Sequence, residues 1–189
     1  MDLSPEDDLR LNVLLANDVH AIRIDESKHH LYALTAAGET TLKLNPNSRP
    51  ERYLKNVREL LSSHFLDSPA GYPIYLRRWT RMGDISANNL ENLLKIGEPE
   101  AVIAVVRSPQ LTENLAARAW WAMPNSENAR RMLECPAVAT ADIARELADF
   151  LIEFLPYEEK PDDMIESVRL VLAADLADRQ GSTAGIQTV

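Results

Sequence analysis

Apolar and polar positions change their period several times in the first part of the chain, which indicates short elements of mixed type. Residues 4–7, Ser-Pro-Glu-Asp, have the features of a helix start: a capping serine, a proline at the first helical position and acids in the first turn. Leu9, Val13 and Leu14 follow as one apolar stripe. We therefore expect a first helix that ends near Asn17.

Alternation of apolar and polar residues then predicts a meander of three antiparallel strands. The first strand holds Ile22 and Ile24, and the next two cover residues 31–34 and 40–44. The dipeptide at residues 37–38, Ala-Gly, predicts the turn between the second and third strands. The short spacings are typical of hairpin connections.

A second helix and a last strand complete this part of the prediction. Pro50 opens the helix, and the segment 67–71, Asp-Ser-Pro-Ala-Gly, breaks it before a strand at residues 72–81. The predicted fold class is α+β. Residues 1–83 form a module with a small antiparallel sheet and two helices.

After Gly83 the period becomes helical throughout. Prolines recur between the apolar runs, and proline is tolerated at a helix start but disfavoured inside a helix. We predict a helical module over residues 84–176, followed by a loose tail at residues 177–189 that lacks periodicity. The expected helices cover residues 87–96, 99–107, 112–122, 126–135, 140–155 and 161–174.

An internal repeat lies within these helices. The segment 100–111 is echoed 27 positions later by the segment 127–138, with proline recurring as Pro109 and Pro136. A fixed period of this length is typical of stacked helical hairpins, so we predict a HEAT-like array. Such arrays act through extended surfaces that meet other macromolecules.

Charge is divided unevenly between the two predicted modules. Residues 1–83 hold 11 Lys and Arg against 11 Asp and Glu, whereas residues 84–189 hold 9 against 18. Binding to nucleic acid or to an anionic membrane needs positive charge, so the helical half is poorly suited to either. We expect a protein partner with a basic surface.

The composition bounds the cellular setting. No apolar run approaches the roughly 18 to 20 residues that cross a bilayer, and the acidic start of the chain differs from a secretory signal. The single cysteine, Cys135, allows no internal disulfide. We therefore expect a cytoplasmic protein without membrane insertion.

The strongest candidate binding residues lie in the predicted last strand. Arg77, Arg78, Trp79 and Arg81 place three cations around one tryptophan, and strand alternation puts Arg77, Trp79 and Arg81 on one face. That face suits an acidic segment of a partner or a small anion. The alternative is structural: Trp79 packs under a helix, and the arginines pair with acids of the helical half.

Trp120 and Trp121 form a second candidate. Adjacent helical positions point about 100° apart, so both rings do not fit one core comfortably. We expect one tryptophan in the core and the other at the junction between repeats or on the surface. An exposed ring would serve as a partner anchor, and a ring filling an inter-repeat groove is the alternative.

Signals for catalysis, metals and cofactors are weak. His29 and His30 are neighbours on an expected strand and so point to opposite faces, while His20 and His64 are distant in sequence. Cys135 is expected at the end of a helix, where the dipole opposes a thiolate. No glycine-rich phosphate loop or hydrolase motif is present. We expect neither a metal nor a cofactor and no enzymatic activity.

Five segments of the chain carry a resemblance to a known family: residues 9–17, 21–27, 71–83, 119–124 and 164–172. They resemble the family of the sulfur reduction protein DsrS, which is encoded with dissimilatory sulfite reductase in sulfur-oxidising bacteria. The resemblance implies a cytoplasmic accessory protein in the oxidation of stored sulfur and supplies no catalytic residues. Family members continue past the point that matches the end of this chain.

Two functional hypotheses follow from the residues and the resemblance. In the first, the acidic helices and the arginine-tryptophan strand dock proteins of a sulfur-oxidation system. In the second, the protein carries a small anion on Arg77 and Arg81, or a persulfide on Cys135. We favour the first, because repeat arrays bind through extended faces and the lone thiol is poorly placed for activation.

Overall fold

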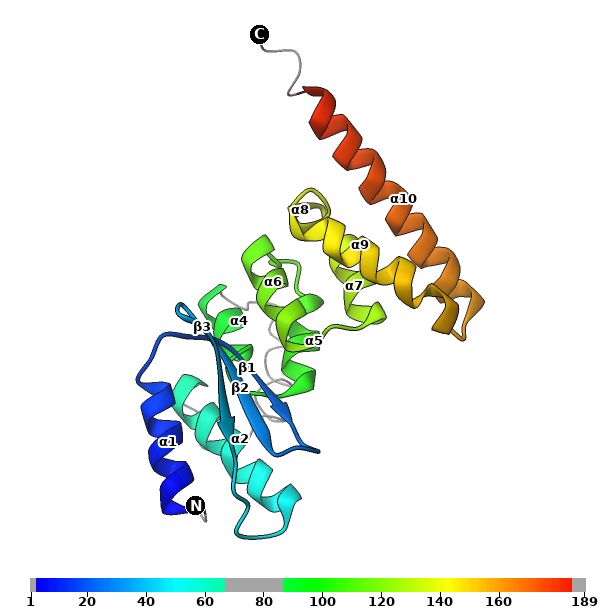
Figure 1. Cartoon of the computed structure of the whole chain (residues 1–189). Coiled ribbons are helices and arrows are strands. Elements are labelled where there is room, and N and C mark those ends of the chain that lie inside the picture. Colours follow the sequence, from blue (N-terminus) through cyan, green and yellow to red (C-terminus); the bar gives the residue numbers. More distant parts are fainter. Residues whose placement is uncertain (1–2, 67–86, 185–189) are drawn as a thin grey trace. The chain divides into compact units, whose positions relative to one another are not determined.

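The computed structural model describes residues 3–66 and 87–184, and for residues 87–88 and 175–184 it describes only the backbone. The chain divides into two compact units, residues 1–105 and 106–189. The first unit contains the sheet and the second is helical in its described part, so the α+β class is confirmed. Figure 1 labels the elements along the chain.

The sheet of the first unit is the predicted meander. Strands β1 (Val19–Asp25), β2 (His30–Thr35) and β3 (Gly38–Lys43) pair antiparallel in the order β1-β2-β3. Thr35 pairs with Gly38 across a two-residue loop, and Gly38 has the positive φ that favours glycine. The sequence placed this turn correctly.

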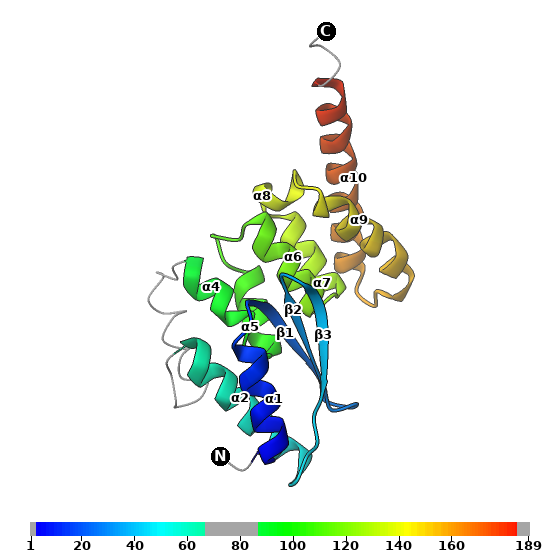
Figure 2. The same ribbon diagram turned by 60° about the vertical axis from the view of Figure 1, so that its left-hand side comes forward.

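One face of the sheet builds the core of the first unit. Strand alternation puts Ile22, Leu31 and Ala33 on this face, where they pack with helices α1 (Pro5–Leu15) and α2 (Pro50–Leu66) (Figures 1 and 2). The opposite face is more polar, and the Arg23 guanidinium lies 4.8 Å from the centre of the Tyr32 ring. This alternation is what a sheet with one buried face requires.

Helix α1 begins as predicted but presents a different face to the core. The Ser4 hydroxyl accepts a hydrogen bond from Asp7 N–H, which caps the helix. Leu14 is buried, whereas Leu9 and Val13 are exposed, so the predicted apolar stripe is wrong in two of three positions. The inward face instead carries Asp7, Leu11, Leu14 and Leu15.

The buried carboxylate of Asp7 accounts for this rotation. It accepts hydrogen bonds from the backbone N–H of Asn45 (2.7 Å), from the Asn45 side-chain amide (3.1 Å) and from the Tyr53 hydroxyl. Burial alone would raise the pKa of Asp7, but the bonds from Tyr53 and Asn45 outweigh it and leave the pKa below its usual value. Burial and the same carboxylate raise the pKa of Tyr53.

Helices α4 (Ala87–Leu93) and α5 (Pro99–Val106) follow the second gap in the description, and the unit boundary falls at the end of α5. The sequence placed the module boundary at Gly83, which lies outside the described residues. The loop between α4 and α5 belongs to the first unit for a physical reason: Ile22 N–H donates to the carbonyl of Leu94 (2.8 Å), and Gly97 lies against Ile24. Arg58 of α2 ties the same loop by a hydrogen bond to the Gly97 carbonyl (3.3 Å).

The helices of the second unit begin close to their predicted positions. They are α6 (Glu113–Ala122), α7 (Ser126–Leu133), α8 (Pro136–Ala139), α9 (Ile143–Phe154) and α10 (Pro161–Ala184), with a short 3-10 turn η1 (Leu155–Tyr157) after α9. Thr112 and Asn125 cap α6 and α7 through their side chains. Pro161 stands at the first helical position of α10, as expected, and Pro136 stands at the first position of α8.

Two details of the helical prediction are wrong. The four-residue helix α8 was not predicted, because so short a helix has no periodicity to read. Helix α10 continues through Ala184, where the sequence predicted a loose tail from residue 177. Alanine and leucine favour helix strongly enough to extend α10 without an amphipathic pattern. Both views show the last turns of α10 running beyond α9 (Figures 1 and 2).

Part of the 27-residue repeat is visible in local structure. Helices α5 and α7 cover residues 99–106 and 126–133, so they begin 27 residues apart. Their buried residues match at the same offset: 101, 102, 105 and 106 in α5, and 128, 129, 132 and 133 in α7. The turns that follow share a backbone bond, from Leu111 N–H to the Ser108 carbonyl and from Val138 N–H to the Cys135 carbonyl. The second turn gains one further bond and becomes α8.

Candidate functional site: the α9–α10 helices

The second unit is held together around one arginine. Arg130 of α7 is nearly buried, with 13% of its side chain exposed, and its Nη1 lies 2.5 Å from Glu158 Oε1 and 3.2 Å from Ser167 Oγ. Its Nη2 lies 3.7 Å from Asp163 Oδ2. These contacts join α7 to the loop before α10 and to the first turns of α10. They fix which side of α10 turns inward.

A hollow of about 630 Å³ lies beside this arginine. Cations and acids line it in equal numbers, and Arg107 pairs with Glu127 (2.7 Å) as Arg131 does with Glu134 (2.5 Å). The Arg169 side chain hydrogen-bonds Glu166 and so lowers the pKa of that carboxyl. Cations already paired with acids leave little charge for binding an anion. The lining residues are Arg107, Glu127, Arg130, Arg131, Glu134, Lys160, Asp163 and Glu166.

An aromatic row runs along α9 into the turn after it. Trp120 of α6 meets Phe150 edge to face at 4.8 Å between ring centres, Phe150 stacks on Phe154 at 4.2 Å, and Phe154 lies 6.0 Å from Tyr157. The row begins in the core and ends at the surface, where Phe154 and Tyr157 are exposed. These last two rings border a smaller hollow of about 350 Å³ next to Arg130.

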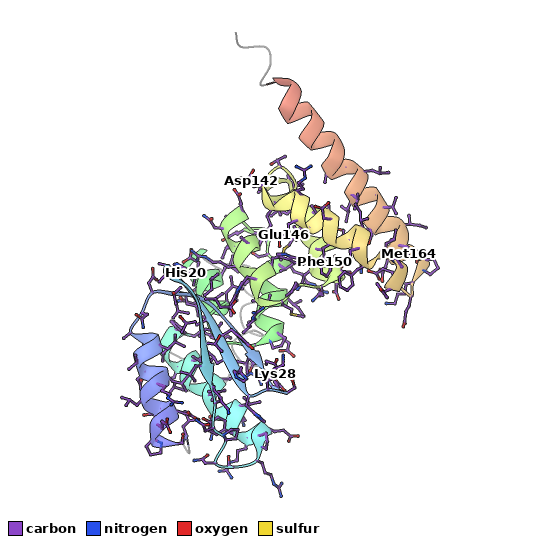
Figure 3. All side chains as sticks on the ribbon, viewed as in Figure 1. His20, Lys28, Asp142, Glu146, Phe150 and Met164 are labelled. Atoms are coloured by element: carbon purple, nitrogen blue, oxygen red, sulfur yellow. The ribbon has the colours of Figure 1, made fainter. Side chains whose placement is uncertain are left out.

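The two tryptophans occupy different environments. Trp120 is buried with 7% exposure, and its indole N–H donates to Glu146 Oε1 of α9 at 2.8 Å. Glu146 and Phe150 lie one turn apart on α9 (Figure 3), so one turn of that helix holds the ring by two contacts. Trp121 is half-buried. Trp120 is thus a core residue of the second unit and offers no surface to a partner.

Helix α10 exposes an apolar flank. We use this name for Met164, Ile165, Val168 and Leu172, all of which are exposed. Their spacing places them on one side of the helix, because residues three to four apart share a face. The inward side carries the buried residues Ser167 and Leu170, and on this same side Asp163 and Glu166 line the charged hollow. Figure 3 labels Met164 at the start of this helix.

Sequence reasoning missed the apolar flank, although a signal for it was present. A helix with one core face needs apolar residues over about 100° of its surface. The segment 164–172 has Met, Ile, Val, Leu, Val and Leu over a wider arc than that. The surplus indicates a second apolar surface on the same helix.

Four predicted site residues, Arg77, Arg78, Trp79 and Arg81, lie outside the described residues. Their role stays a prediction.

The thiol and histidine candidates are spread through the structure. Cys135 is half-buried between α7, which ends two residues earlier than predicted, and α8, and its Sγ lies 3.7 Å from the Leu111 carbonyl oxygen. His20 lies at an irregularity near the start of β1, while His29 and His30 lie at the other end of the β1–β2 hairpin, the end marked by Lys28 in Figure 3. In the described ranges, no three His, Cys, Asp or Glu side chains gather as a metal site would require.

Comparison with known proteins yields no match to a family model, to a curated protein or to a solved structure. The resemblance to the DsrS family therefore stays a prediction from the sequence. Among the helices that the structure describes, none has the length and apolar character needed to span a bilayer.

Proposed function

We propose that this protein is a non-catalytic interaction protein that docks a protein partner on the α9–α10 helices. The observation that carries the proposal is the distribution of exposed apolar side chains. Among the described residues, Leu9 and Val13 are the large exposed apolar residues of the first unit, and all the others lie between Ile152 and Leu172. A cluster of this kind is typical of surfaces that bind other proteins.

The HEAT-like array that the sequence repeat predicts would support the same proposal. Helices α5 and α7 share their length, their buried positions and the turn bond that follows them at a 27-residue offset. Stacked helical hairpins present extended surfaces rather than enclosed active sites. The hollow beside Arg130 is lined by ion pairs, which suits a structural role better than catalysis.

The cellular system is proposed from the sequence resemblance. The segments that resemble the DsrS family support a cytoplasmic accessory protein of dissimilatory sulfur oxidation, with a component of the sulfite reductase system as partner. The carrier alternative gains less support. The Cys135 thiol is half-buried and lies 3.7 Å from the Leu111 carbonyl oxygen, so it is less accessible than the thiol of a sulfur carrier needs to be.

Site-directed photo-cross-linking tests both parts of the proposal. A photoreactive amino acid is introduced at Val168 of the apolar flank and, as a control, at exposed Leu9 of α1. Both proteins are incubated with extract from sulfur-oxidising cells, and adducts are identified by mass spectrometry. We expect a specific adduct from Val168 that Leu9 does not give. A specific adduct with a protein outside sulfur metabolism would retain docking and refute the system, and absence of any Val168-specific adduct would refute docking.

A further inference from the structure

The apolar flank of α10 has the form of a docking strip for another helix. Three of its residues, Ile165, Val168 and Leu172, fall at spacings of three, four and seven along α10, and the strip from Ile165 to Leu172 is about 10 Å long at 1.5 Å per residue. Apolar anchors at these intervals are how one amphipathic helix engages another. The occupant that matches the strip in shape is therefore a helix of about two turns.

The charge around the strip selects among possible occupants. Residues 143–174 hold eight acids and three bases, and with Arg130 of α7, which pairs with Glu158 and Asp163, the acids still exceed the bases by four. The hydrogen bond from Arg169 to Glu166 lowers the pKa of that carboxyl. A surface with this excess of negative charge attracts a cationic partner.

Two other occupants are disfavoured by the same charge. A second copy of this chain would bring two acidic α9–α10 surfaces together, and like charges across an interface cost free energy. An anionic membrane surface would be repelled in the same way, because membrane-binding helices carry Lys and Arg beside their apolar face. Residues 143–174 carry a net negative charge instead.

We propose that the apolar flank of α10 binds a basic amphipathic helix of a partner protein, with the apolar residues of that helix on Ile165, Val168 and Leu172 and its Lys or Arg residues attracted by the net negative charge of α9 and α10. This inference rests on the proposed docking function and names the class of partner. The strip is short, so the complex belongs to the weak, transient class of interfaces. Electrostatic attraction then contributes to the association rate and makes binding sensitive to salt.

Three labelled peptides test the inference with the full chain. The first is an 18-residue helix former with leucine at every third and fourth position and lysine elsewhere. The second replaces each lysine with glutamate, and the third scrambles the first so that no apolar stripe remains. Binding is measured by fluorescence anisotropy at low and at moderate salt. We expect the lysine peptide to bind at least about tenfold more tightly than the other two, and to weaken as salt rises.

A matched pair of variants locates the binding surface. Ile165→Ser/Leu172→Ser removes two anchors of the strip, which are 67% and 58% exposed. Leu9→Ser/Val13→Ser removes an aliphatic pair of similar exposure, 67% and 60%, from α1 of the first unit. We expect the first variant to weaken binding of the lysine peptide at least about tenfold and the second to leave it unchanged.

Each contrary outcome overturns the inference in a recognisable way. Equal binding of the glutamate peptide would remove the charge argument, and equal loss in both variants would remove the strip. A dimer of the protein alone, seen by sedimentation and abolished by Ile165→Ser/Leu172→Ser, would make a second copy the occupant. A Val168 photo-adduct without lysine-peptide binding would refute the basic helix as partner but retain the docking function. Specific binding of the lysine peptide without any adduct from the cell extract would support the basic-helix site but refute docking of a partner in that extract.

Discussion

The two compact units treat their apolar and charged side chains in opposite ways. In its described residues, the first unit buries a carboxylate, Asp7, at the centre of its hydrogen bonds and exposes Leu9 and Val13 as its large apolar residues. The second unit centres on the nearly buried Arg130 and leaves a run of apolar residues exposed on α9 and α10. The difference indicates that the described part of the first unit buries most of its apolar surface, while the second unit exposes apolar surface that a partner could cover.

The buried Asp7 and the nearly buried Arg130 have the same structural role despite their opposite charge. Asp7 joins α1 to the loop after β3 and to α2, and Arg130 joins α7 to the loop before α10 and to α10 itself. Each therefore fixes the rotation of one helix. In α1 the result is a buried polar position with apolar residues outside, and in α10 it is an apolar flank turned to solvent.

The largest effect is expected from Asp7→Ala. The substitution leaves the Tyr53 hydroxyl and the Asn45 N–H groups without their acceptor in the core, which should lower the free energy of unfolding by about 3 to 5 kcal/mol. Urea denaturation measures the loss, and hydrogen exchange assigns it to residues of the first unit. Asp8→Ala, in the same helical turn but exposed, is the control and should cost under about 0.5 kcal/mol. Similar losses in the two variants would contradict the role given to Asp7.

A smaller loss is expected from Arg130→Ala, because this centre retains contact with water. The variant leaves Glu158 and Asp163 without their main partner, and we expect a loss of about 2 to 3 kcal/mol confined to the second unit. Arg131→Ala, which removes an exposed pair on the next residue, should cost under about 1 kcal/mol. The same two measurements apply. If Arg130→Ala lowers the free energy of unfolding as much as Asp7→Ala or more, the contrast between a fully buried and a partly solvated polar centre is wrong.

Acid should weaken the first unit through Asp7. The pKa of Asp7 is lower in the folded protein than in the unfolded chain, so its contribution is complete above the unfolded value of about 4 and is lost as the pH falls through the folded value. Glu98 affects stability in the opposite sense, because burial raises its pKa in the folded protein. Its contribution to folding stability is present below the pKa of the unfolded chain and is lost as the pH rises through the pKa of the folded protein. Unfolding curves between pH 2 and pH 7 should show the acid loss in the wild type and a flatter profile in Asp7→Asn. An unchanged acid profile in that variant would refute the assignment.

The contrast between the units also explains which features the sequence could predict. The β1–β2–β3 meander and the starts of α1, α2, α5 and α7 follow from local signals, namely alternation, a capping Ser4 and the positions of proline. The inward position of Asp7 depends on Tyr53 and Asn45, which are about 40 residues away in sequence. No periodicity carries that information, and a charged residue is normally read as a surface position.

The candidate site shows the same limit. The sequence marked Trp120 and Trp121 as a pair that one core would not hold, but the bond from Trp120 to Glu146 decides which ring is buried, and that bond spans two helices. The apolar flank was predictable in part, since α10 has more apolar positions than one core face needs. Which of these positions turn outward depends on Arg130, because its contacts with Asp163 and Ser167 set the rotation of α10.

The smallest effect on stability is expected where the effect on binding should be largest. Ile165→Ser/Leu172→Ser changes two exposed residues of the apolar flank, so the free energy of unfolding should stay within about 0.5 kcal/mol per site of the wild type. Urea denaturation of this variant beside Leu9→Ser/Val13→Ser tests the point, because both remove exposed aliphatic pairs from helices. A loss of several kcal/mol in the α10 variant alone would mean that the flank belongs to the core of the second unit. Unchanged stability together with weakened peptide binding would instead separate the two uses of α10, with its inner side holding the unit together and its apolar flank reserved for a partner.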